Sequence, residues 1–406
     1  MDLYEKYHLT RIINACGKMT HLAGAAVLPP IAAQANAALP CFFDLGELEE
    51  RAGALIAKAT GAEWGCISAC TSAGITLSVA ACITGSDRGK IAQLPDTSDM
   101  ANEVIIQRGH SVNFGAPITQ MIRLSGASSI EIGTVNDTAE YHLENALGEQ
   151  TAAVVVVVSH HTTRYGTIPL KRVVEIAHAR GVPVIVDGAA QSFLIRHIVA
   201  TGVDLAICSG HKYLSGTTSG IVCGRRELVE AVALQSRGIG RPMKVGKEGI
   251  FGAMAALEHR LGLDIDAWQA EQDRKMHRII DRLAPLSGGA MSIEPDPNGN
   301  PFSRARMDLD PTTAGLNAAT LAHALADGNP SIRLRAHHAE EGYLMIDAIE
   351  MTDGEIELSC ARIAELINAT HAEKQELNQR YKGTTMPSQW SWLGTPSDEM
   401  THITGV

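Results

Sequence analysis

The sequence is poor in aromatic residues, has no long apolar run and carries no excess of basic residues. Only 4% of its 406 residues are Phe, Trp or Tyr, which argues against base-stacking platforms. Lys and Arg number 34 against 45 Asp and Glu, so the net charge is −11 and the basic surface that general nucleic-acid binding needs is missing. No window holds the roughly 18 apolar residues of a membrane span, and the charged start, MDLYEKYHLT, has no signal-peptide core. We therefore expect a cytoplasmic protein that binds neither nucleic acid nor membrane.

Paired cysteines are also missing. The eight cysteines are scattered, mostly within apolar runs, and none forms a Cys-X-X-Cys pair. Cys66 and Cys70 are the closest two, but neither a second pair nor a histidine cluster accompanies them. We expect reduced thiols, with no disulfide framework and no metal site.

What the sequence does contain is the pattern of an α/β protein. Apolar residues make up 45% and charged residues 19%, and the length suits one large domain and a smaller one. The run AAVVVVV, residues 152–158, predicts a strand buried on both faces, and the helix that Pro169 opens and Gly181 ends leads to the strand VPVIVD. Strands VDLAICSG and SGIVCG follow. This alternation predicts a mostly parallel central sheet with helices on both faces.

The chain changes character after about residue 249. FGAMAALEHRL and the next thirty residues read as one long amphipathic helix, followed by short strands and a further helix. We predict an N-terminal segment (1–40), a large cofactor-binding domain (41–249), a small C-terminal α+β domain (250–370) and a tail (371–406). Trp390 and Trp392 lie in that tail and could contact the body or a partner subunit.

Two strand ends and one turn form the chemical centre. Asp187 ends a predicted buried strand, Lys212 follows the next one in a glycine-rich turn, and CTSAG (70–74) opens a helix whose N–H groups favour an anion. Alone, a strand-end Asp is often a cap and a loop Lys a solvated charge. Together they form the set that pyridoxal phosphate requires: an amine for a Schiff base, a carboxylate for the pyridine nitrogen and a helix N-terminus for the phosphate.

At this point the chain resembles the fold-type I pyridoxal-phosphate enzymes of the selenocysteine synthase group, and within it the D-glucosaminate-6-phosphate ammonia-lyase branch. The matching stretches run in order over nearly the whole chain: INACGKMTHLAG, QRGHSVNFGAP, EIGTVNDT, SHHTTRYGTIPL, VPVIVDGAAQ, ICSGHKYLSG, GRPMKVGKEG and GNPSIRLR. The resemblance implies an aminotransferase-like fold and pyridoxal 5′-phosphate as the cofactor.

The resemblance also implies roles by position. Lys212 would attach the cofactor, Asp187 would pair with its pyridine nitrogen, and His110 would lie against its ring, although an ordinary loop histidine is as good an interpretation of His110. His160 or its neighbour His161 would reach the cofactor or the substrate, or form a polar strand edge. The phosphate ligands would be Thr71, Ser72, Ala73 and Ser209.

Anion-binding groups are expected in two further places. Arg237, Arg241, Lys244 and Lys247 form a basic run without a carboxylate, which is either a solvated face or an anion site. The resemblance favours an anion site here and implies that Arg241 and Lys244 reach the cofactor phosphate, that of the same or of a neighbouring subunit. Arg335, or Arg333 on the same strand face, would grip the substrate α-carboxylate, and Lys18 would assist.

The implied activity is elimination of the β-hydroxyl and ammonia from a hydroxylated 2-amino acid, such as an amino-sugar acid, to give a 2-keto acid. An aldolase, a racemase or another β-lyase would use the same cofactor residues, whereas selenium transfer to tRNA is disfavoured by the negative charge. A silent ligand-binding or scaffold protein is the alternative without chemistry. A homodimer or larger assembly is implied by the resemblance, since such sites are built from two subunits.

Overall fold

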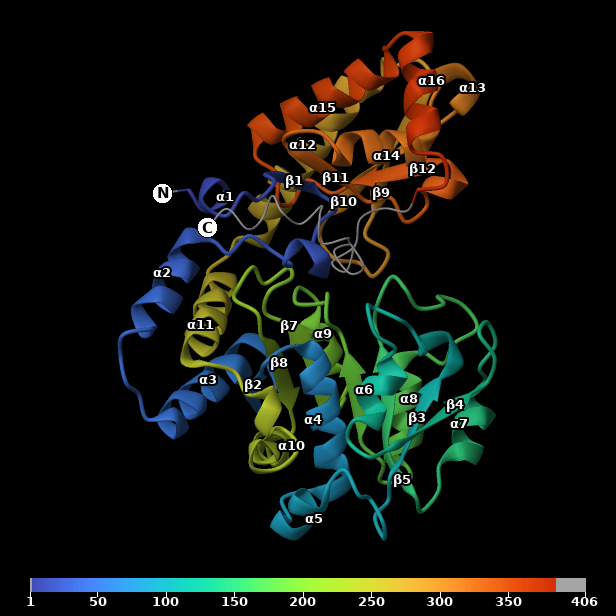
Figure 1. Cartoon of the computed structure of the whole chain (residues 1–406). Helices are drawn as coiled ribbons and strands as arrows, with labels where there is room; N and C mark the ends of the chain where they lie inside the picture. The colour runs from blue at the N-terminus through green and yellow to red at the C-terminus, as the bar shows by residue number, and fades with distance from the viewer. Residues whose placement is uncertain (1, 385–406) are drawn as a thin grey trace, which may run out of the picture. The chain divides into compact units, whose positions relative to one another are not determined.

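The structure is a computed structural model that describes residues 2–384, and it divides the chain into two compact units (Figure 1). The large unit consists of Val27–Leu263 together with the short segment Pro297–Asn300. The small unit takes the chain up to Ala26, then Asp264–Asp296, and then the chain from Pro301 onward. Both units are therefore assembled from stretches that are distant in sequence.

A seven-stranded sheet in the order β2-β8-β7-β6-β5-β3-β4 forms the centre of the large unit. Strands β7 to β4 in this order run parallel, and β8 is antiparallel to both of its neighbours. The strands are β2 (Trp64–Ser68), β3 (Glu103–Gln107), β4 (Ser128–Ile132), β5 (Thr151–Val157), β6 (Val184–Asp187), β7 (Leu205–Ser209) and β8 (Gly220–Gly224). The predicted α/β fold with a mostly parallel sheet is confirmed.

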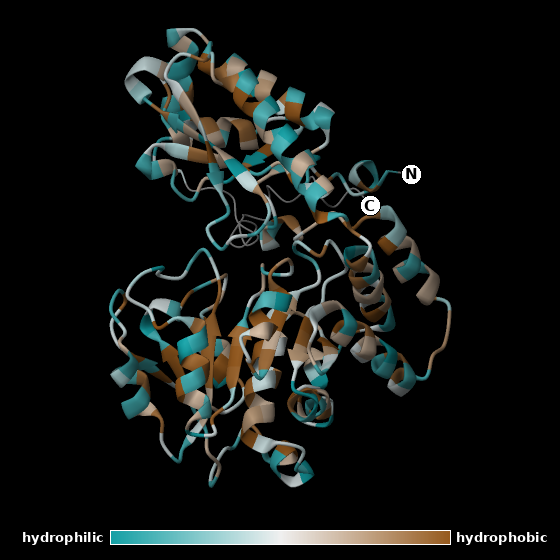
Figure 2. Cartoon of the chain, turned by 180° about the vertical axis from the view of Figure 1, so that it is seen from behind, coloured by the Kyte–Doolittle hydropathy of each residue, from teal (hydrophilic) through white to brown (hydrophobic). Residues whose placement is uncertain are grey.

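Side chains alternate between the two faces of this sheet, and each face has its own core. Val184 and Val186 of β6 belong to one apolar cluster and Ile185 to the other. Helices α3, α8, α9 and α11 cover the first face, whereas α4, α6 and α10 cover the second. Figure 2 shows hydrophobic residues concentrated on these strands. Burial on both faces explains why β5 reads as an unbroken valine run rather than an alternating pattern.

The helices of the large unit begin and end at residues that suit those positions. In α3, for example, the Asp44 side chain accepts from the Glu47 N–H, and Gly61 ends the helix in the left-handed conformation at φ 77°. The helices are α2 (Pro29–Ala38), α3 (Leu45–Thr60), α4 (Thr71–Thr84), α5 (Arg88–Gln93), α6 (Ile118–Arg123), α7 (Glu140–Ala146), α8 (Leu170–His178), α9 (Ile195–Ala200), α10 (Arg226–Leu234) and α11 (Lys247–Leu261).

The small unit contains a three-stranded antiparallel sheet, β12-β10-β9, and a parallel pair, β1 with β11. Its core is formed by side chains of these strands with helices α12, α14 and α15. The strands are β1 (Ile12–Ala15), β9 (Gly289–Pro295), β10 (Ser303–Leu309), β11 (Ser331–Leu334) and β12 (Tyr343–Ile346). The helices are α1 (Leu3–Lys6), α12 (Ile265–Leu283), α13 (Pro311–Ala314), α14 (Ala318–Ala326), α15 (Asp353–Ile367) and α16 (His371–Arg380).

The boundaries of the two compact units differ from the domain boundaries predicted from the sequence. The predicted N-terminal segment is divided at Val27, because β1 pairs with β11 of the small unit and α2 packs on α11. The prediction of one long helix after residue 249 is wrong, because the chain forms two helices there. Helix α11 ends at Leu261 in the large unit, and α12 begins after its N-cap Asp264 in the small unit. Residues 371–380 form α16 and not an irregular tail. Trp390 and Trp392 lie outside the described residues.

Two further features bear on the sequence predictions. No helix within residues 2–384 has the length and hydropathy to cross a membrane. Burial raises the pKa of the Cys66, Cys82 and Cys223 thiols to about 12, so these thiols stay protonated and unreactive at neutral pH.

Candidate active site

The carboxyl ends of the parallel strands bring together the residues that the sequence predicts for cofactor chemistry. Asp187 is the last residue of β6, Ser209 is the last of β7, and Lys212 follows in the next turn. His110 lies in a short 3-10 turn directly after β3. In a parallel sheet the carboxyl ends share one edge, and that edge is where α/β proteins bind ligands.

Asp187 is buried, with 4% of its surface exposed, and its turn is held from several sides. One carboxylate oxygen accepts from the Ala189 N–H at 3.0 Å. The fully buried Gln191 closes the turn, because its N–H donates to the Gly188 carbonyl and its side chain donates to the Val158 carbonyl. Burial raises the pKa of Asp187, and Lys212 and the Ala189 N–H partly offset that rise. A cationic partner at this carboxylate would therefore be strongly favoured.

Lys212, a half-buried residue, is the complementary group. Burial lowers the pKa of its ammonium, and the Asp187 charge partly opposes this effect. Each group thus shifts the pKa of the other, which places them close together at the sheet edge. A buried lysine with a lowered pKa can act as a nucleophile and as a base at neutral pH.

The N-terminus of α4 provides an anion cradle. Thr71, Ser72 and Ala73 form its first turn, where N–H groups have no acceptor within the helix. The N-cap, Cys70, makes no side-chain capping bond. The Thr71 hydroxyl is buried and has no hydrogen-bond partner among the described residues. A phosphate would satisfy these donors, so the residues present fit the phosphate of pyridoxal phosphate.

Ser209 has a partner that the sequence interpretation missed. Its hydroxyl lies 3.0 Å from Nδ1 of His211, the residue before Lys212. Burial and the neighbouring Lys212 charge lower the pKa of His211. The motif SGHK contained the signal, since it places a hydroxyl and an imidazole two residues apart beside the lysine. The Ser209 hydroxyl is thus already engaged, which makes it a less open phosphate ligand than Thr71.

His110 is buried and neutral. Burial lowers the pKa of its imidazole to about 4, and the Val157 N–H donates to its Nδ1 at 3.3 Å. Because Nδ1 accepts, the ring proton is on Nε2 at neutral pH. His110 can therefore offer an uncharged ring face or an Nε2–H donor, but not an imidazolium.

The other predicted residues of the large unit lie in more exposed positions. His160 is half-buried and His161 exposed, with their ring centroids 3.8 Å apart. Arg241 and Lys244 are exposed on the segment between α10 and α11. Neither cation forms an ion pair within the described part of the chain, so both are open to an external anion.

The predicted substrate residues all belong to the small unit. Parallel pairing of β1 with β11 aligns Asn14 with Arg333, and this brings the motif at residues 12–23 beside GNPSIRLR. Burial raises the pKa of the Cys16 thiol to about 12, and the charges of Arg335 and Arg333 partly oppose that rise, so the two guanidinium groups lie around the same thiol. The Arg333 Nε is buried and lacks a hydrogen-bond partner among residues 2–384.

Lys18 differs from this pattern. Its side chain is 1% exposed and forms an ion pair with Glu350, which also accepts from the Ala26 N–H. Glu350 already neutralises this ammonium within the small unit. Lys18 therefore takes part in a buried ion pair and is not an open ligand for the substrate.

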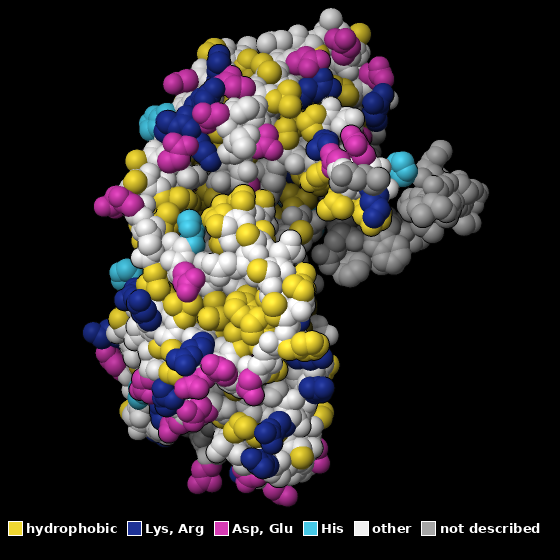
Figure 3. All heavy atoms as spheres, turned by 90° about the vertical axis from the view of Figure 1, so that its left-hand side faces the viewer, with side chains coloured by type: hydrophobic (Ala, Val, Ile, Leu, Met, Phe, Trp, Pro, Cys, Tyr) yellow, Lys and Arg dark blue, Asp and Glu magenta, His cyan; other side chains and the backbone are white. Residues whose placement is uncertain are grey.

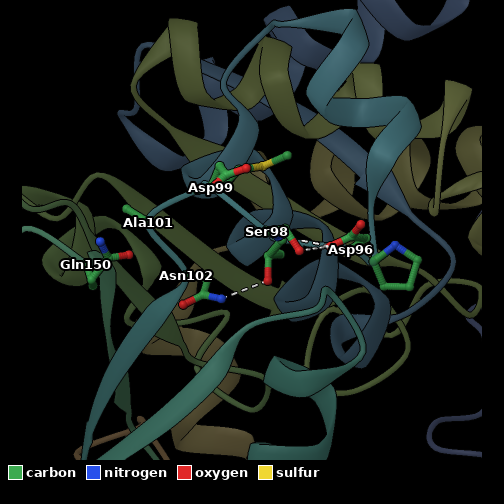
Figure 4. Close-up of a pocket in the computed structure, with 9 residues that line it drawn as sticks. Asp96, Ser98, Asp99, Ala101, Asn102 and Gln150 are labelled. Carbon is green, nitrogen blue, oxygen red and sulfur yellow. Dashed lines mark hydrogen bonds between the residues drawn. The ribbon is translucent and has the colours of Figure 1, made fainter.

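A separate cavity of about 670 Å³ lies away from this edge. Its lining comes from the loop before β3, residues 95–102, and from Gln150 before β5 (Figure 4). These residues mark the amino ends of the strands, opposite to the ends that carry Asp187 and Lys212. Asp96 accepts from the Ser98 hydroxyl and Asn102 donates to Thr97, so much of the lining is engaged internally.

Comparisons with known proteins agree with this geometry. The family model "SelA: L-seryl-tRNA selenium transferase" matches residues 54–286, more than half of the chain. D-glucosaminate-6-phosphate ammonia lyase of Salmonella typhimurium is 37% identical over 91% of this chain and 99% of its own. A 5′-C-glycyluridine monooxygenase-decarboxylase of a Streptomyces species is also 37% identical, over 90% of this chain and 92% of its own. A solved structure of D-glucosaminate-6-phosphate ammonia-lyase has a TM-score of 0.82 and 36% identity, covering 90% of this chain and 98% of that one.

Proposed function

The chain belongs to the L-seryl-tRNA selenium transferase (SelA) family, and from this we propose that it is a pyridoxal-phosphate-dependent lyase that removes ammonia from a hydroxylated 2-amino acid. The observation that carries the proposal is the pair of the buried Asp187 and the half-buried Lys212, each shifting the pKa of the other at the sheet edge. The similarity to an ammonia lyase over nearly the full length of both chains supports the substrate class, an amino-sugar acid such as D-glucosaminate 6-phosphate.

When bound, pyridoxal phosphate supplies an electron sink that makes the Cα proton of an amino acid acidic. Lys212 Nζ would bind the cofactor aldehyde, and the Asp187 carboxylate would hold the pyridine nitrogen protonated. Thr71, Ser72 and Ala73 would hold the phosphate at the start of α4, and His110 would lie against the ring. Ser209 would complete the set, with Arg241 and Lys244 as outer cations.

The proton transfers follow from the environment of Lys212. Once the substrate amine had taken its place, Nζ of Lys212 would be free, and burial, which lowers the pKa of its ammonium, would favour the uncharged amine that accepts the Cα proton. The β-hydroxyl then leaves as water, with its proton supplied by Lys212 or by a histidine such as His160. The released enamine takes up water and loses ammonia, which leaves the 2-keto acid. The net change is loss of ammonia alone.

The substrate α-carboxylate would bind either Arg333, which lies in β11, or Arg335, which directly follows that strand. Arg333 is the stronger candidate on structural grounds, because its buried Nε still lacks a partner among the described residues. A bidentate contact to a carboxylate would satisfy this donor. Arg335 remains the alternative that sequence resemblance favours.

A product assay tests the activity. We expect purified protein loaded with pyridoxal phosphate to release ammonia and a 2-keto acid in equal amounts from hydroxylated D- or L-amino acids or amino-sugar acids. The assay should give the same rate without dioxygen, since elimination of water and ammonia consumes no oxidant. Release of carbon dioxide that depends on dioxygen would instead support monooxygenase-decarboxylase chemistry, the activity named for the second relative.

The cofactor attachment has its own test. We expect Lys212→Ala protein to lose the visible absorbance that covalent attachment of pyridoxal phosphate gives, because the amine proposed to attach the cofactor is removed. Lys171→Ala, an exposed lysine of α8, is the matched control and should keep the absorbance. Visible absorbance that survives in Lys212→Ala would show that another group binds the cofactor.

We also propose that the protein is a homodimer or a larger homo-oligomer. Large apolar side chains are exposed between α2 and α3: Phe42 is fully exposed, and Leu39 and Leu45 are about half exposed. Figure 3 shows hydrophobic side chains gathered on the face of α2 and α3. Contiguous patches of this kind mark interfaces, and pairing of identical patches about a two-fold axis is the common solution.

Light scattering of the intact protein tests the assembly. Phe42→Ser should shift the mass toward the monomer, since it removes the most exposed ring of the patch. Tyr165→Ser, an exposed aromatic of the loop after β5, should leave the mass unchanged. A wild-type protein that is monomeric at micromolar concentration would contradict the proposal.

A further inference from the structure

Arg260, near the end of α11, is a half-buried residue with a buried Nη1, and the proposed chemistry leaves it unused. Burial lowers the pKa of its guanidinium to about 10, so it is still charged at neutral pH. No carboxylate among the described residues forms an ion pair with it, and its Nη1 is buried without a hydrogen-bond partner there. Burying part of a charged group without a counter-ion lowers stability, so the presence of Arg260 at this position suggests a functional role.

Arg260 contacts residues of the two turns that follow Asp187 and Lys212. Its Nη2 donates to the backbone carbonyl of Tyr213, the residue that follows Lys212. Its guanidinium also lies over the ring of Phe193, 3.8 Å from the ring centroid. Phe193 belongs to the turn that leaves Asp187 and contains Gln191. One side chain thus bridges the two strand-end turns.

Helix α11 is placed to hold that bridge in position. Upstream of Arg260, the Thr217 hydroxyl donates to the Gly249 carbonyl at 3.0 Å. Gly216 and Gly252 allow the turn and the helix to approach closely: a Cβ on Gly216 would lie 2.8 Å from the Ala256 Cβ, and one on Gly252 would lie 2.3 Å from Thr217. The helix therefore packs along the turn after Lys212, and Arg260 extends this contact to the turn after Asp187.

We propose that Arg260 is a positioning residue that fixes the placement of Lys212 relative to Asp187. The inference rests on the proposed function, because it assigns Arg260 a role through these two groups. A planar guanidinium suits the task, since it stacks on an aromatic ring with its face while its edge donates to a carbonyl. The ammonium of a lysine, as a point charge, cannot do both with the same geometry.

The test compares Arg260→Met with wild type and with a matched control. Arg196→Met is the control, because Arg196 likewise donates to backbone carbonyls, those of Ala59 and Lys58, but away from both turns. In Arg260→Met we expect pyridoxal phosphate to dissociate at least 10-fold more readily and the visible absorbance to titrate at a different pH. We expect kcat to fall at least 10-fold while KM changes less than 3-fold. Arg260→Lys should recover only part of each effect.

Hydrogen exchange of the cofactor-free protein gives a readout that does not depend on loading. Amides of residues 188–192 and 210–216 should exchange at least 10-fold faster in Arg260→Met than in wild type or Arg196→Met. Arg260→Met with unchanged exchange and an unchanged absorbance titration would overturn the inference. If Arg260→Met fails to fold, Arg260→Lys and Phe193→Leu decide the matter, and wild-type behaviour of both would overturn it.

The outcomes separate this inference from the proposed function. Wild-type protein that binds no pyridoxal phosphate would defeat the function, while the exchange comparison would still test whether Arg260 orders the two turns. Wild-type protein that binds the cofactor, with Arg260→Met identical to it, would defeat the inference alone.

Discussion

At the scale of single residues, the site is dominated by ionisable groups whose pKa values are shifted by burial away from the usual range. Burial raises the pKa of Asp187 and lowers the pKa values of Lys212, His110 and His211. Ionisable groups with shifted pKa values lower the stability of the protein without a ligand, and they are typical of sites that bind a charged ligand. A cationic ring nitrogen beside Asp187 and an electrophile beside Lys212 would relieve both costs.

His110 allows a test of this cost through pH. A histidine whose pKa is lower in the folded state than the usual 6.5 binds its proton more readily when unfolded, so its stability contribution is lost as pH falls from about 6.5 toward 4. Cofactor-free His110→Asn should therefore lose less stability between pH 7 and pH 5 than wild type, by about 2 kcal/mol. Urea unfolding at the two pH values measures this.

The comparison cancels the other histidines, since they are common to both proteins. Equal losses in wild type and His110→Asn would mean that His110 is not buried in its neutral form.

At the scale of secondary-structure elements, the start of α4 is the most informative part of the site. Twelve of the fourteen α4 residues are buried, yet the first turn carries an unsatisfied hydroxyl and no side-chain cap. Buried polar groups without partners are rare in folded proteins, and they often mark a ligand position. The start of this helix is therefore arranged for a bound anion and not for the stability of the empty protein.

Thr71→Val tests that interpretation. We expect the affinity for pyridoxal phosphate to fall by about 10-fold, since a hydrogen bond to a charged group contributes about 1.5 kcal/mol or more. Stability of the cofactor-free protein should stay equal or rise, because an unsatisfied buried hydroxyl is removed. Fluorescence titration and thermal unfolding measure the two effects.

Thr76→Val provides the opposite pattern in the same helix. The Thr76 hydroxyl donates to the Met121 carbonyl at 2.8 Å, so its removal should lower stability by about 1 to 3 kcal/mol with little effect on cofactor affinity. Thr71→Val with reduced stability and unchanged affinity would assign Thr71 to the fold alone.

At the scale of the whole molecule, neither unit is a continuous piece of sequence. Strand β1 lies near the start of the chain, yet it pairs in parallel with β11 more than 300 residues later. Ile13 and Ala15 of β1 are buried in the core of the small unit, together with Ile332 and Leu334 of β11. The N-terminal residues are therefore a structural part of the unit that carries Arg333 and Arg335.

Ile13→Ala should destabilise the small unit selectively. Loss of a buried isoleucine costs about 2 to 5 kcal/mol, so hydrogen exchange should accelerate in β10, β11 and α15 with little change in the seven-stranded sheet. Ile12→Ala is the control from the same strand, because Ile12 is 38% exposed. Equal effects of the two substitutions would contradict the pairing of β1 with the small-unit core.

The amino-acid sequence was enough to predict the architecture of the large unit and the residues that we propose for its chemistry. Runs such as that of β5 are too β-branched and too uniformly apolar for a surface element, and strand-end polar residues such as Asp187 must then share one edge. The lysine, the carboxylate and the helix start are local features with local signals. They could be recognised because their meaning depends on residues that are close in sequence.

The boundaries of the units, and the groups that meet across long sequence distances, became visible in the folded chain alone. The pairing of β1 with β11, the pairing of Lys18 with Glu350 and the break between α11 and α12 have no local signature, because each depends on contacts whose partners are remote in sequence. Arg260 belongs to the same class. In the sequence it is an ordinary helical arginine, and only packing reveals that its guanidinium is buried between the turns of Asp187 and Lys212.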